Sequence, residues 1–158
     1  MSVIDANSEH DRDWDWYASD ASGHIAHFTS AGLRVLPASV KRSAETTLAL
    51  IAFFESLPDR SLDVLLSARA EQELAQITEK AKIEWRLREF VRTARRGLFS
   101  FDTEMLHGKS DYYLIAAPEQ PLTVDELPYE IRSMLLHIAG PVAFASMTTI
   151  DEATTLQW

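Results

Sequence analysis

Carboxylates are the side chains of this sequence most able to do chemistry, and they gather in residues 5–20 and 119–130. In the first stretch Arg12 is the only lysine or arginine. An acidic surface attracts basic proteins and raises the rate at which they associate. We therefore predict that the chain binds a partner through carboxylates of these two stretches. The predicted contact residues are Asp11, Asp13, Asp15, Asp20, Asp125, Glu126 and Glu130.

No arrangement of residues in the sequence matches a known catalytic motif. No serine lies in a Gly-x-Ser-x-Gly turn, and the five glycines are isolated instead of gathered in a phosphate-binding loop. The chain has no cysteine, which excludes cysteine nucleophiles, thiolate zinc sites and disulfides. We therefore predict a protein that is not an enzyme and that uses no cofactor.

The spacing of the first aspartates is similar to that of a calcium-binding loop. Asp11, Asp13 and Asp15 alternate as in a calcium-binding loop. Trp16 and Ser22, however, stand where such a loop needs a glycine and a glutamate. The histidines are too scattered to form a metal-binding motif. The sequence therefore predicts no metal site.

An alternative role is open for polar residues close to Trp16. His24 and His27 lie three positions apart, a spacing that places them on opposite faces of a strand. Either could act together with Asp15. A polar pocket around these side chains, with strongly shifted pKa values, would favour a small-molecule-binding or enzymatic domain.

Basic residues are concentrated in one segment of an acidic chain. The formal net charge is −9, yet residues 80–96 carry a net +5, so the remainder sums to −14. Trp85 lies among these cations, as an aromatic does on a nucleic-acid-binding face. The acidic remainder would repel a phosphate backbone, and pairs such as Glu84 with Arg88 suit an ordinary helix surface. We predict no direct binding of nucleic acid.

The elements that must position these residues follow from hydrophobic periodicity. Hydrophobic side chains alternate in face along residues 14–28, on both sides of a turn at residues 20–23, and this pattern predicts a β-hairpin. Residues 40–57 have a helical period, with Ser39 as a capping residue. Residues 62–98 are also helical in period, as far as Gly97, and no proline or glycine decides whether they form one helix or two.

In the C-terminal part, the hydrophobic pattern changes from a helical period to the alternation typical of strands. Residues 99–117 predict a second hairpin with its turn at residues 107–109. The segments that follow predict a helical turn, a helix and a closing strand, at residues 123–127, 129–138 and 142–147 respectively. This order predicts an α+β fold, in which helices pack on one face of a mostly antiparallel sheet built from hairpins.

Length and composition favour one folded domain without a membrane partner. The chain has 158 residues, of which 46% are hydrophobic and 25% charged, as is typical of a globular domain. We expect residues 1–12 to be a flexible acidic N-terminus and residues 13–158 to form a single domain. The longest apolar run, residues 48–54, is too short to cross a membrane. The first 13 residues lack the apolar core of a secretory signal, so we expect a cytoplasmic protein.

One part of the sequence resembles a known group of proteins. Asp15-Trp16-Tyr17-Ala18, followed by GHIAHFTSAG at residues 23–32, is similar to the opening hairpin of small bacterial proteins. That group includes immunity proteins of contact-dependent growth inhibition and of related polymorphic toxin systems. The resemblance covers about the first quarter of the chain and transfers no binding residues, because immunity interfaces diverge with each toxin. It implies a cytoplasmic protein that binds and neutralises one cognate toxin domain, often a basic nuclease.

Overall fold

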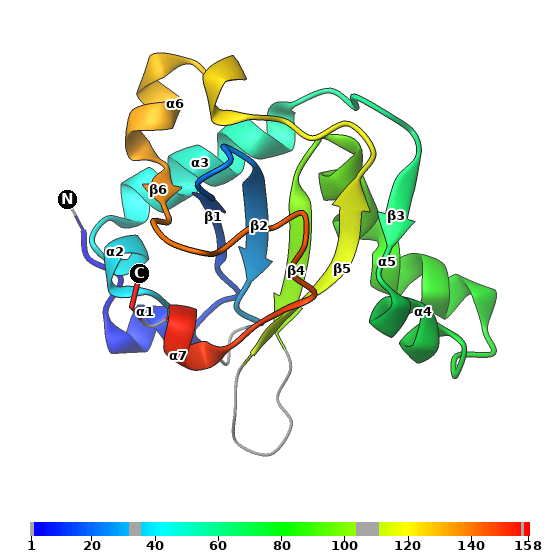
Figure 1. Ribbon diagram of the computed structural model, residues 1–158. Coiled ribbons are helices and arrows are strands. Elements are labelled where there is room, and N and C mark those ends of the chain that lie inside the picture. The colour runs from blue at the N-terminus through cyan, green and yellow to red at the C-terminus, as the bar shows by residue number, and fades with distance from the viewer. Residues whose placement is uncertain (1, 32–35, 104–110, 156) are drawn as a thin grey trace.

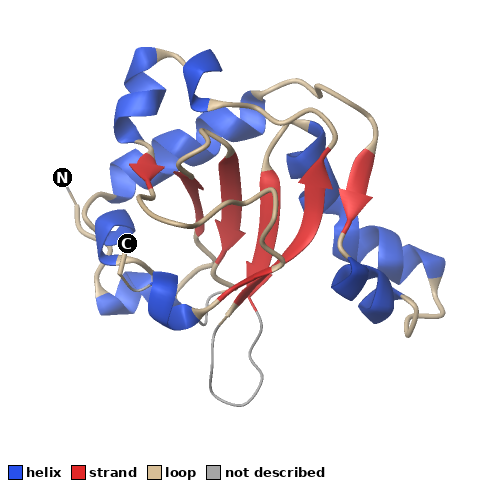
Figure 2. Ribbon diagram, viewed as in Figure 1, coloured by secondary structure: helices blue, strands red, loops and turns tan. Residues whose placement is uncertain are grey.

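A computed structural model describes residues 2–31, 36–103, 111–155 and 157–158. In this part of the chain, seven strands form one mixed sheet with helices packed beside it (Figures 1 and 2), which confirms the predicted α+β class. The strands are β1 Asp15–Ser19, β2 Ile25–Thr29, β3 Val64–Leu66, β4 Phe99–Thr103, β5 Tyr112–Pro118, β6 Leu136–His137 and β7 Thr149–Ile150. The helices are α1 Ala6–His10, α2 Ala38–Lys41, α3 Ala44–Ser56, α4 Ala68–Leu74, α5 Lys80–Arg95, the 3-10 turn η1 Val124–Glu126, α6 Tyr129–Met134 and α7 Glu152–Thr155.

The order of strands in the sheet is β3-β5-β4-β2-β1-β6, and β7 pairs with the other end of β5. The predicted hairpins are present, since β1 with β2 and β4 with β5 are antiparallel. The prediction of a mostly antiparallel sheet is wrong, because β2 pairs with β4 in parallel and β1 pairs with β6 in parallel. The chain between β2 and β4 contains helices that cross over the sheet, and such a crossover returns the next strand in the same direction.

Three helices cover one face of the sheet. In Figure 1, α3 lies against β1, whereas α5 lies against β4 and β5 with α4 beside it. The helix predicted at residues 40–57 is interrupted, because Ser43 caps α3 with its hydroxyl, which accepts a hydrogen bond from the backbone N–H of Thr46. Residues 62–98 form two helices and not one, with the break between Leu74 and Lys80, and they begin with the strand β3 instead of a helix.

The opposite face of the sheet is covered by the C-terminal segment. Phe144 is fully buried and packs edge-on against Phe28, which itself stacks on Trp16 with ring centroids 4.1 Å apart. The strand predicted at residues 142–147 is absent there, and the helix predicted at residues 129–138 ends at Met134, because the chain leaves it to pair as β6. The 3-10 turn η1 confirms the helical turn predicted at residues 123–127.

The N-terminal segment is more structured than the sequence predicted. Asp5 caps α1, and Ile4 is buried with its N–H donating to the carbonyl of Lys41. The predicted turn at residues 107–109 lies outside the described residues. Among those described, no helix has the length and apolar character needed to cross a membrane.

Candidate functional site

The sheet face beneath α3 and α5 has a polar strip at its centre. The strand register places Tyr17, His27 and Ser100 in one row across β1, β2 and β4. Side chains two positions apart share a face. The next row on the same face therefore consists of Asp15, Thr29 and Asp102.

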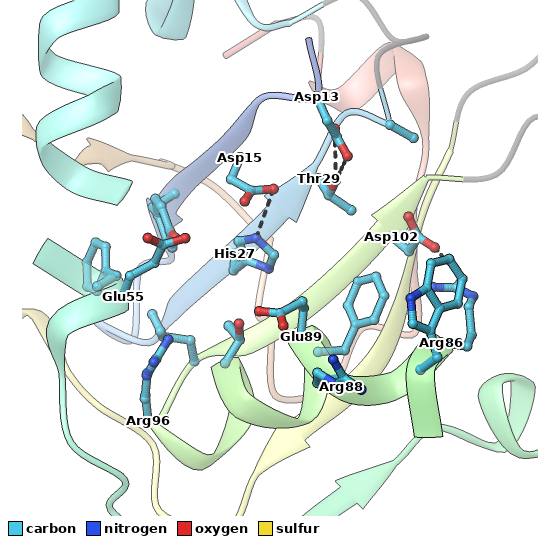
Figure 3. A pocket seen from close by; sticks show the side chains of 17 residues that line it. Asp13, Asp15, His27, Thr29, Glu55, Arg86, Arg88, Glu89, Arg96 and Asp102 are labelled. Carbon is cyan, nitrogen blue, oxygen red and sulfur yellow. Dashed lines mark hydrogen bonds and ion pairs between the residues drawn. The ribbon is translucent and has the colours of Figure 1, made fainter. Parts of the chain in front are cut away.

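This strip separates two hydrophobic clusters. Under α3, Tyr17 packs against Leu50 and Phe54, whereas under α5, Phe90 packs against Tyr113. The two helices do not close over the polar rows, and an open cleft of about 480 Å³ remains between them (Figure 3). We call it the α3–α5 cleft. A concave site that combines aromatic rings with convergent polar groups is a candidate binding site.

A chain of three polar side chains runs from the floor of the cleft into the sheet. The Nε2 atom of His27 lies 3.3 Å from an Asp15 oxygen, and its Nδ1 atom lies 3.0 Å from the hydroxyl of Ser100. Burial acts to raise the pKa of Asp15, but the hydrogen bond and charge of His27, the hydroxyl of Thr29 and the charge of Arg12 together outweigh it, so the pKa lies below the ordinary value. Ser100 is completely buried and does not line the cleft.

Asp13 precedes β1 and is held by hydroxyl groups. The hydroxyl of Thr29 lies 3.0 and 3.1 Å from its two carboxylate oxygens, and that of Ser30 lies 3.2 Å from one of them. These donors fix the direction of the carboxylate. We call Asp13 and Asp15 the acidic end of the cleft.

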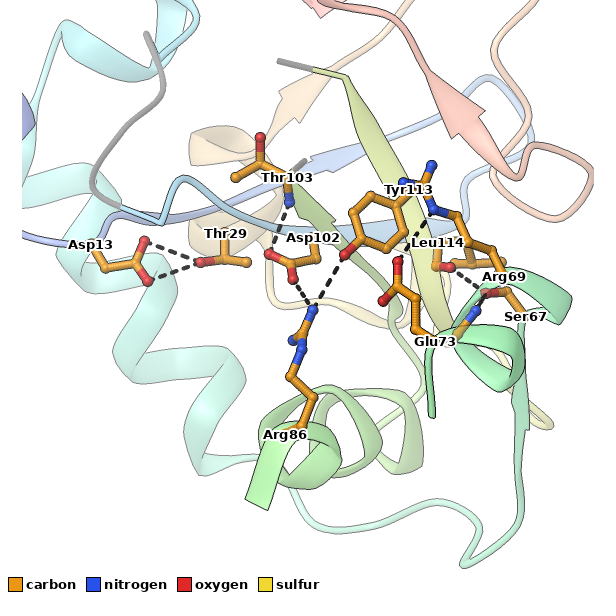
Figure 4. Close-up of polar contacts among 11 residues, drawn as sticks. Asp13, Thr29, Ser67, Arg69, Glu73, Arg86, Asp102, Thr103, Tyr113 and Leu114 are labelled. Carbon is orange, nitrogen blue, oxygen red and sulfur yellow. Dashed lines mark hydrogen bonds and ion pairs between the residues drawn. The ribbon is translucent and has the colours of Figure 1, made fainter. Parts of the chain in front are cut away.

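An internal ion pair stands beside the acidic end. The guanidinium of Arg86 on α5 binds the carboxylate of Asp102 and lies 3.3 Å from the Tyr113 hydroxyl (Figure 4). It also lies 5.0 Å from the ring centroid of Phe90. Burial, together with the charges of Asp102 and Glu73, raises the pKa of Tyr113 to about 12.

The carboxylates of the cleft are incompletely neutralised. Among the described residues, no lysine or arginine nitrogen comes within 4.0 Å of a carboxylate oxygen of Asp13, Asp15 or Glu55. Arg96 lines the cleft next to Tyr17, and its Nε atom is buried without a hydrogen-bond partner in this part of the structure. The cleft is therefore able to attract charged groups from outside.

Three of the predicted contact residues lie at the surface, and their contact with a partner stays a prediction. Asp11 and Asp13 are exposed and Asp15 is half-exposed, and Asp13 and Asp15 line the cleft. The prediction of Asp20 as a contact residue is wrong, because Asp20 is 5% exposed and its carboxylate accepts three backbone hydrogen bonds. Its oxygens hold the hairpin turn in place and are not available to a partner.

The second predicted group lies elsewhere. Thr123, just before η1, pairs with His24 at the turn of the β1–β2 hairpin, opposite to the end where Asp15 begins β1. Asp125, Glu126 and Glu130 are exposed there, and Glu126 forms an ion pair with Arg60 at 2.9 Å. The structure therefore does not join the two acidic groups into one surface.

Several cleft residues escaped the sequence prediction. Glu55, Arg86 and Asp102 come from elements far apart in the sequence, so no local pattern joins them. A signal was present in the strands, where polar residues recur two positions apart on a face that two helices cover. His24 belongs to the hairpin turn and does not line the cleft, whereas His27 does.

Within the described ranges, no three histidine, aspartate or glutamate side chains are arranged to hold a metal ion. Comparisons of the chain with protein-family models, with curated proteins and with solved structures found no match.

Proposed function

We propose that this protein is an immunity protein that binds a basic toxin domain and occludes it, with the α3–α5 cleft as the centre of its contact surface. The observation that carries the proposal is the group of carboxylates at this cleft, Asp13, Asp15 and Glu55, which have no lysine or arginine partner among the described residues. The formal charge of −9 supports it, because a basic partner would be steered toward the molecule.

An exposed aromatic residue at the cleft supports a protein as the partner. Trp85 on α5 lines the cleft and is 72% exposed, although a tryptophan normally gains from burial. Tryptophan is enriched among the residues that dominate protein–protein binding energies. The proposal includes a cytoplasmic location, where a toxin nuclease would meet its substrate.

The test is a complex with the C-terminal domain of the protein that the neighbouring gene encodes, which the proposal expects to be the toxin. We expect a complex by calorimetry in about 50 mM NaCl, and an affinity at least about 10-fold lower in about 300 mM NaCl, because salt screens exposed charges. The double variant Asp13→Asn, Asp15→Asn should weaken the complex. Asp125→Asn removes the same kind of charge at the far end and should have little effect. A failure to associate at low salt would contradict the proposal.

A second candidate is supported by the hydrogen-bonded chain from Asp15 through His27 to Ser100. Both ring nitrogens of His27 have partners in this arrangement, so Asp15 is the group that could exchange a proton with a molecule in the cleft, with His27 as its orienting partner. Ser100 could not act as a nucleophile, because it is fully buried. A small molecule that co-purifies with the chain, and is lost from a His27→Ala variant, would favour this candidate over the immunity function.

A further inference from the structure

The acidic end of the cleft contains two carboxylates that their neighbours orient and that form no ion pair with a described lysine or arginine, although the charges of His27 and Arg12 act on Asp15. The hydroxyl groups of Thr29 and Ser30 hold Asp13, and the imidazole of His27 holds Asp15. A hydroxyl carries no charge, so it fixes a carboxylate without satisfying it electrostatically. Two fixed anions at an open cleft form a preorganised site for a cation, since little freedom remains to be lost on binding.

The cleft already shows how it accommodates one guanidinium group. Arg86 on α5 binds Asp102 on β4. Asp102 comes one position after Phe101, and Phe101 pairs with Phe28 on the neighbouring strand β2. The same guanidinium lies over the ring of Phe90. Carboxylate, guanidinium and aromatic ring therefore meet in a single arrangement one strand away from Thr29 and two strands away from Asp15.

The cleft offers two parts of this arrangement a second time and lacks the third. Asp13 and Asp15 supply the carboxylates, and the exposed ring of Trp85, the neighbour of Arg86 on α5, lines the same cleft. No described lysine or arginine completes it by an ion pair. From this we infer that the acidic end of the α3–α5 cleft is a receptor for a guanidinium group, an arginine side chain presented by the protein partner.

The chemistry of the group favours arginine over lysine. A guanidinium offers five N–H donors on a planar fork and can contact two carboxylates that do not converge on one point. It also stacks on an aromatic ring and is more weakly hydrated than an ammonium group. The ammonium group of lysine is a compact charge that would satisfy one carboxylate at a time.

The other arginines of the cleft do not fill this role. Arg96 follows α5 at the end of the cleft next to Tyr17, where its positive charge acts on the Tyr17 hydroxyl. Arg88 lines the cleft from the exposed side of α5, and it forms no ion pair with a described residue. The carboxylates of the acidic end therefore remain open to a partner.

The inference rests on the proposed function but can be tested without a toxin. The probe is N-acetyl-L-arginine methylamide, titrated into the labelled full chain at low salt, where exposed charges are least screened. We expect saturable NMR shifts of the Trp85 indole N–H and of the backbone amides around Asp15 and Thr29. The citrulline analogue, which keeps the shape but lacks the charge, should cause no saturable shift, and the lysine analogue should bind more weakly.

Variants locate the binding. Asp15→Asn should reduce the affinity for the arginine probe by roughly 10-fold, because it removes a charge-assisted hydrogen bond. Trp85→Ala, at an exposed helix position that the fold does not need, should reduce it by about 2- to 5-fold. The matched control Asp125→Asn should bind as the unchanged chain does. Equal binding of the citrulline or lysine probe, or unchanged binding to both cleft variants, would overturn the inference.

The outcomes separate the inference from the proposed function. A toxin complex that forms fully with Asp15→Asn, together with no binding of the arginine probe, would refute the guanidinium site and leave the immunity function intact. Specific binding of the probe at Trp85 without any toxin complex would support the site and contradict the immunity function.

Discussion

Asp20 shows how one carboxylate can join two distant parts of the chain. One of its oxygens accepts hydrogen bonds from the N–H groups of Ser22 and His24, each at 3.0 Å. The other accepts from the N–H of Phe144 at 2.8 Å. The aspartate therefore closes the β1–β2 turn and fastens the C-terminal segment to it.

Replacement of Asp20 by alanine should lower the free energy of unfolding by about 2–4 kcal/mol, because it leaves buried N–H groups without acceptors. The measurement is urea denaturation of the variant and the unchanged chain. Asp125→Ala is the matched control, since that side chain is 91% exposed and its loss should cost less than about 0.5 kcal/mol. Equal losses in the two variants would show that the Asp20 hydrogen bonds are not structural.

Tyr113 predicts how stability responds to alkaline pH. Burial and nearby carboxylates raise its pKa to about 12, so the folded state holds the phenol proton more tightly than the unfolded chain, where the ordinary value is 10.0. The associated stability is complete below pH 10 and is lost as the pH rises toward about 12. Burial also raises the pKa of Tyr17, which acts in the same direction.

We expect the free energy of unfolding to fall between about pH 10 and 12, and to fall less steeply in Tyr113→Phe, by on the order of 1–3 kcal/mol over that window. Urea denaturation at a series of pH values measures both slopes. Parallel curves for the two proteins would mean that Tyr113 titrates alike in the folded and unfolded states.

At the scale of elements, the junction between α5 and β4 depends on Gly97. This residue has φ +99°, in the left-handed region that favours glycine, and its carbonyl accepts the N–H of Leu122 at 2.8 Å. A Cβ atom there would lie 2.7 Å from the backbone nitrogen of Leu122. The junction also sets the position of α5, and with it Trp85 and Arg86, above the strands.

Gly97→Ala should therefore destabilise the fold more than Gly140→Ala. Both residues have positive φ, but a Cβ atom at Gly140 would meet nothing within 4 Å. Backbone strain alone should cost about 1–2 kcal/mol at Gly140, and the close contact should add further loss at Gly97. Thermal and urea unfolding measure the difference in the free energy of unfolding. Similar losses of stability in both variants would mean that the α5–β4 junction can shift to accommodate the added Cβ atom.

At the scale of the whole molecule, the two faces of the sheet are used differently. The face with Trp16, Phe28 and Phe101 is closed by the C-terminal segment into a continuous aromatic core. The other face is closed at its two sides by α3 and α5 and left open between them. The polar row of Asp15, Thr29 and Asp102 lies in that opening, so the unequal covering of the two faces creates the site.

The sequence by itself determined the local features of this protein. Alternation and a turn at residues 20–23 predicted the first hairpin, and helical periods located the helical regions, because these patterns depend on neighbours along the chain. Acidity identified Asp11, Asp13 and Asp15 as exposed or partly exposed carboxylates. The sequence also predicted the α+β class, which the order of segments largely fixes.

Only the tertiary structure decided the direction of strand pairing and the composition of the site. Residues 64–66 form a strand because the edge of β5 is available to pair with them, although their pattern continued a helix. The carboxylate of Asp20 is buried where it accepts a hydrogen bond from the backbone N–H of Phe144, 124 positions away. The cleft joins Asp15, Glu55 and Arg86 from three elements, and contacts between such distant segments are set by packing, which no local period in the sequence records.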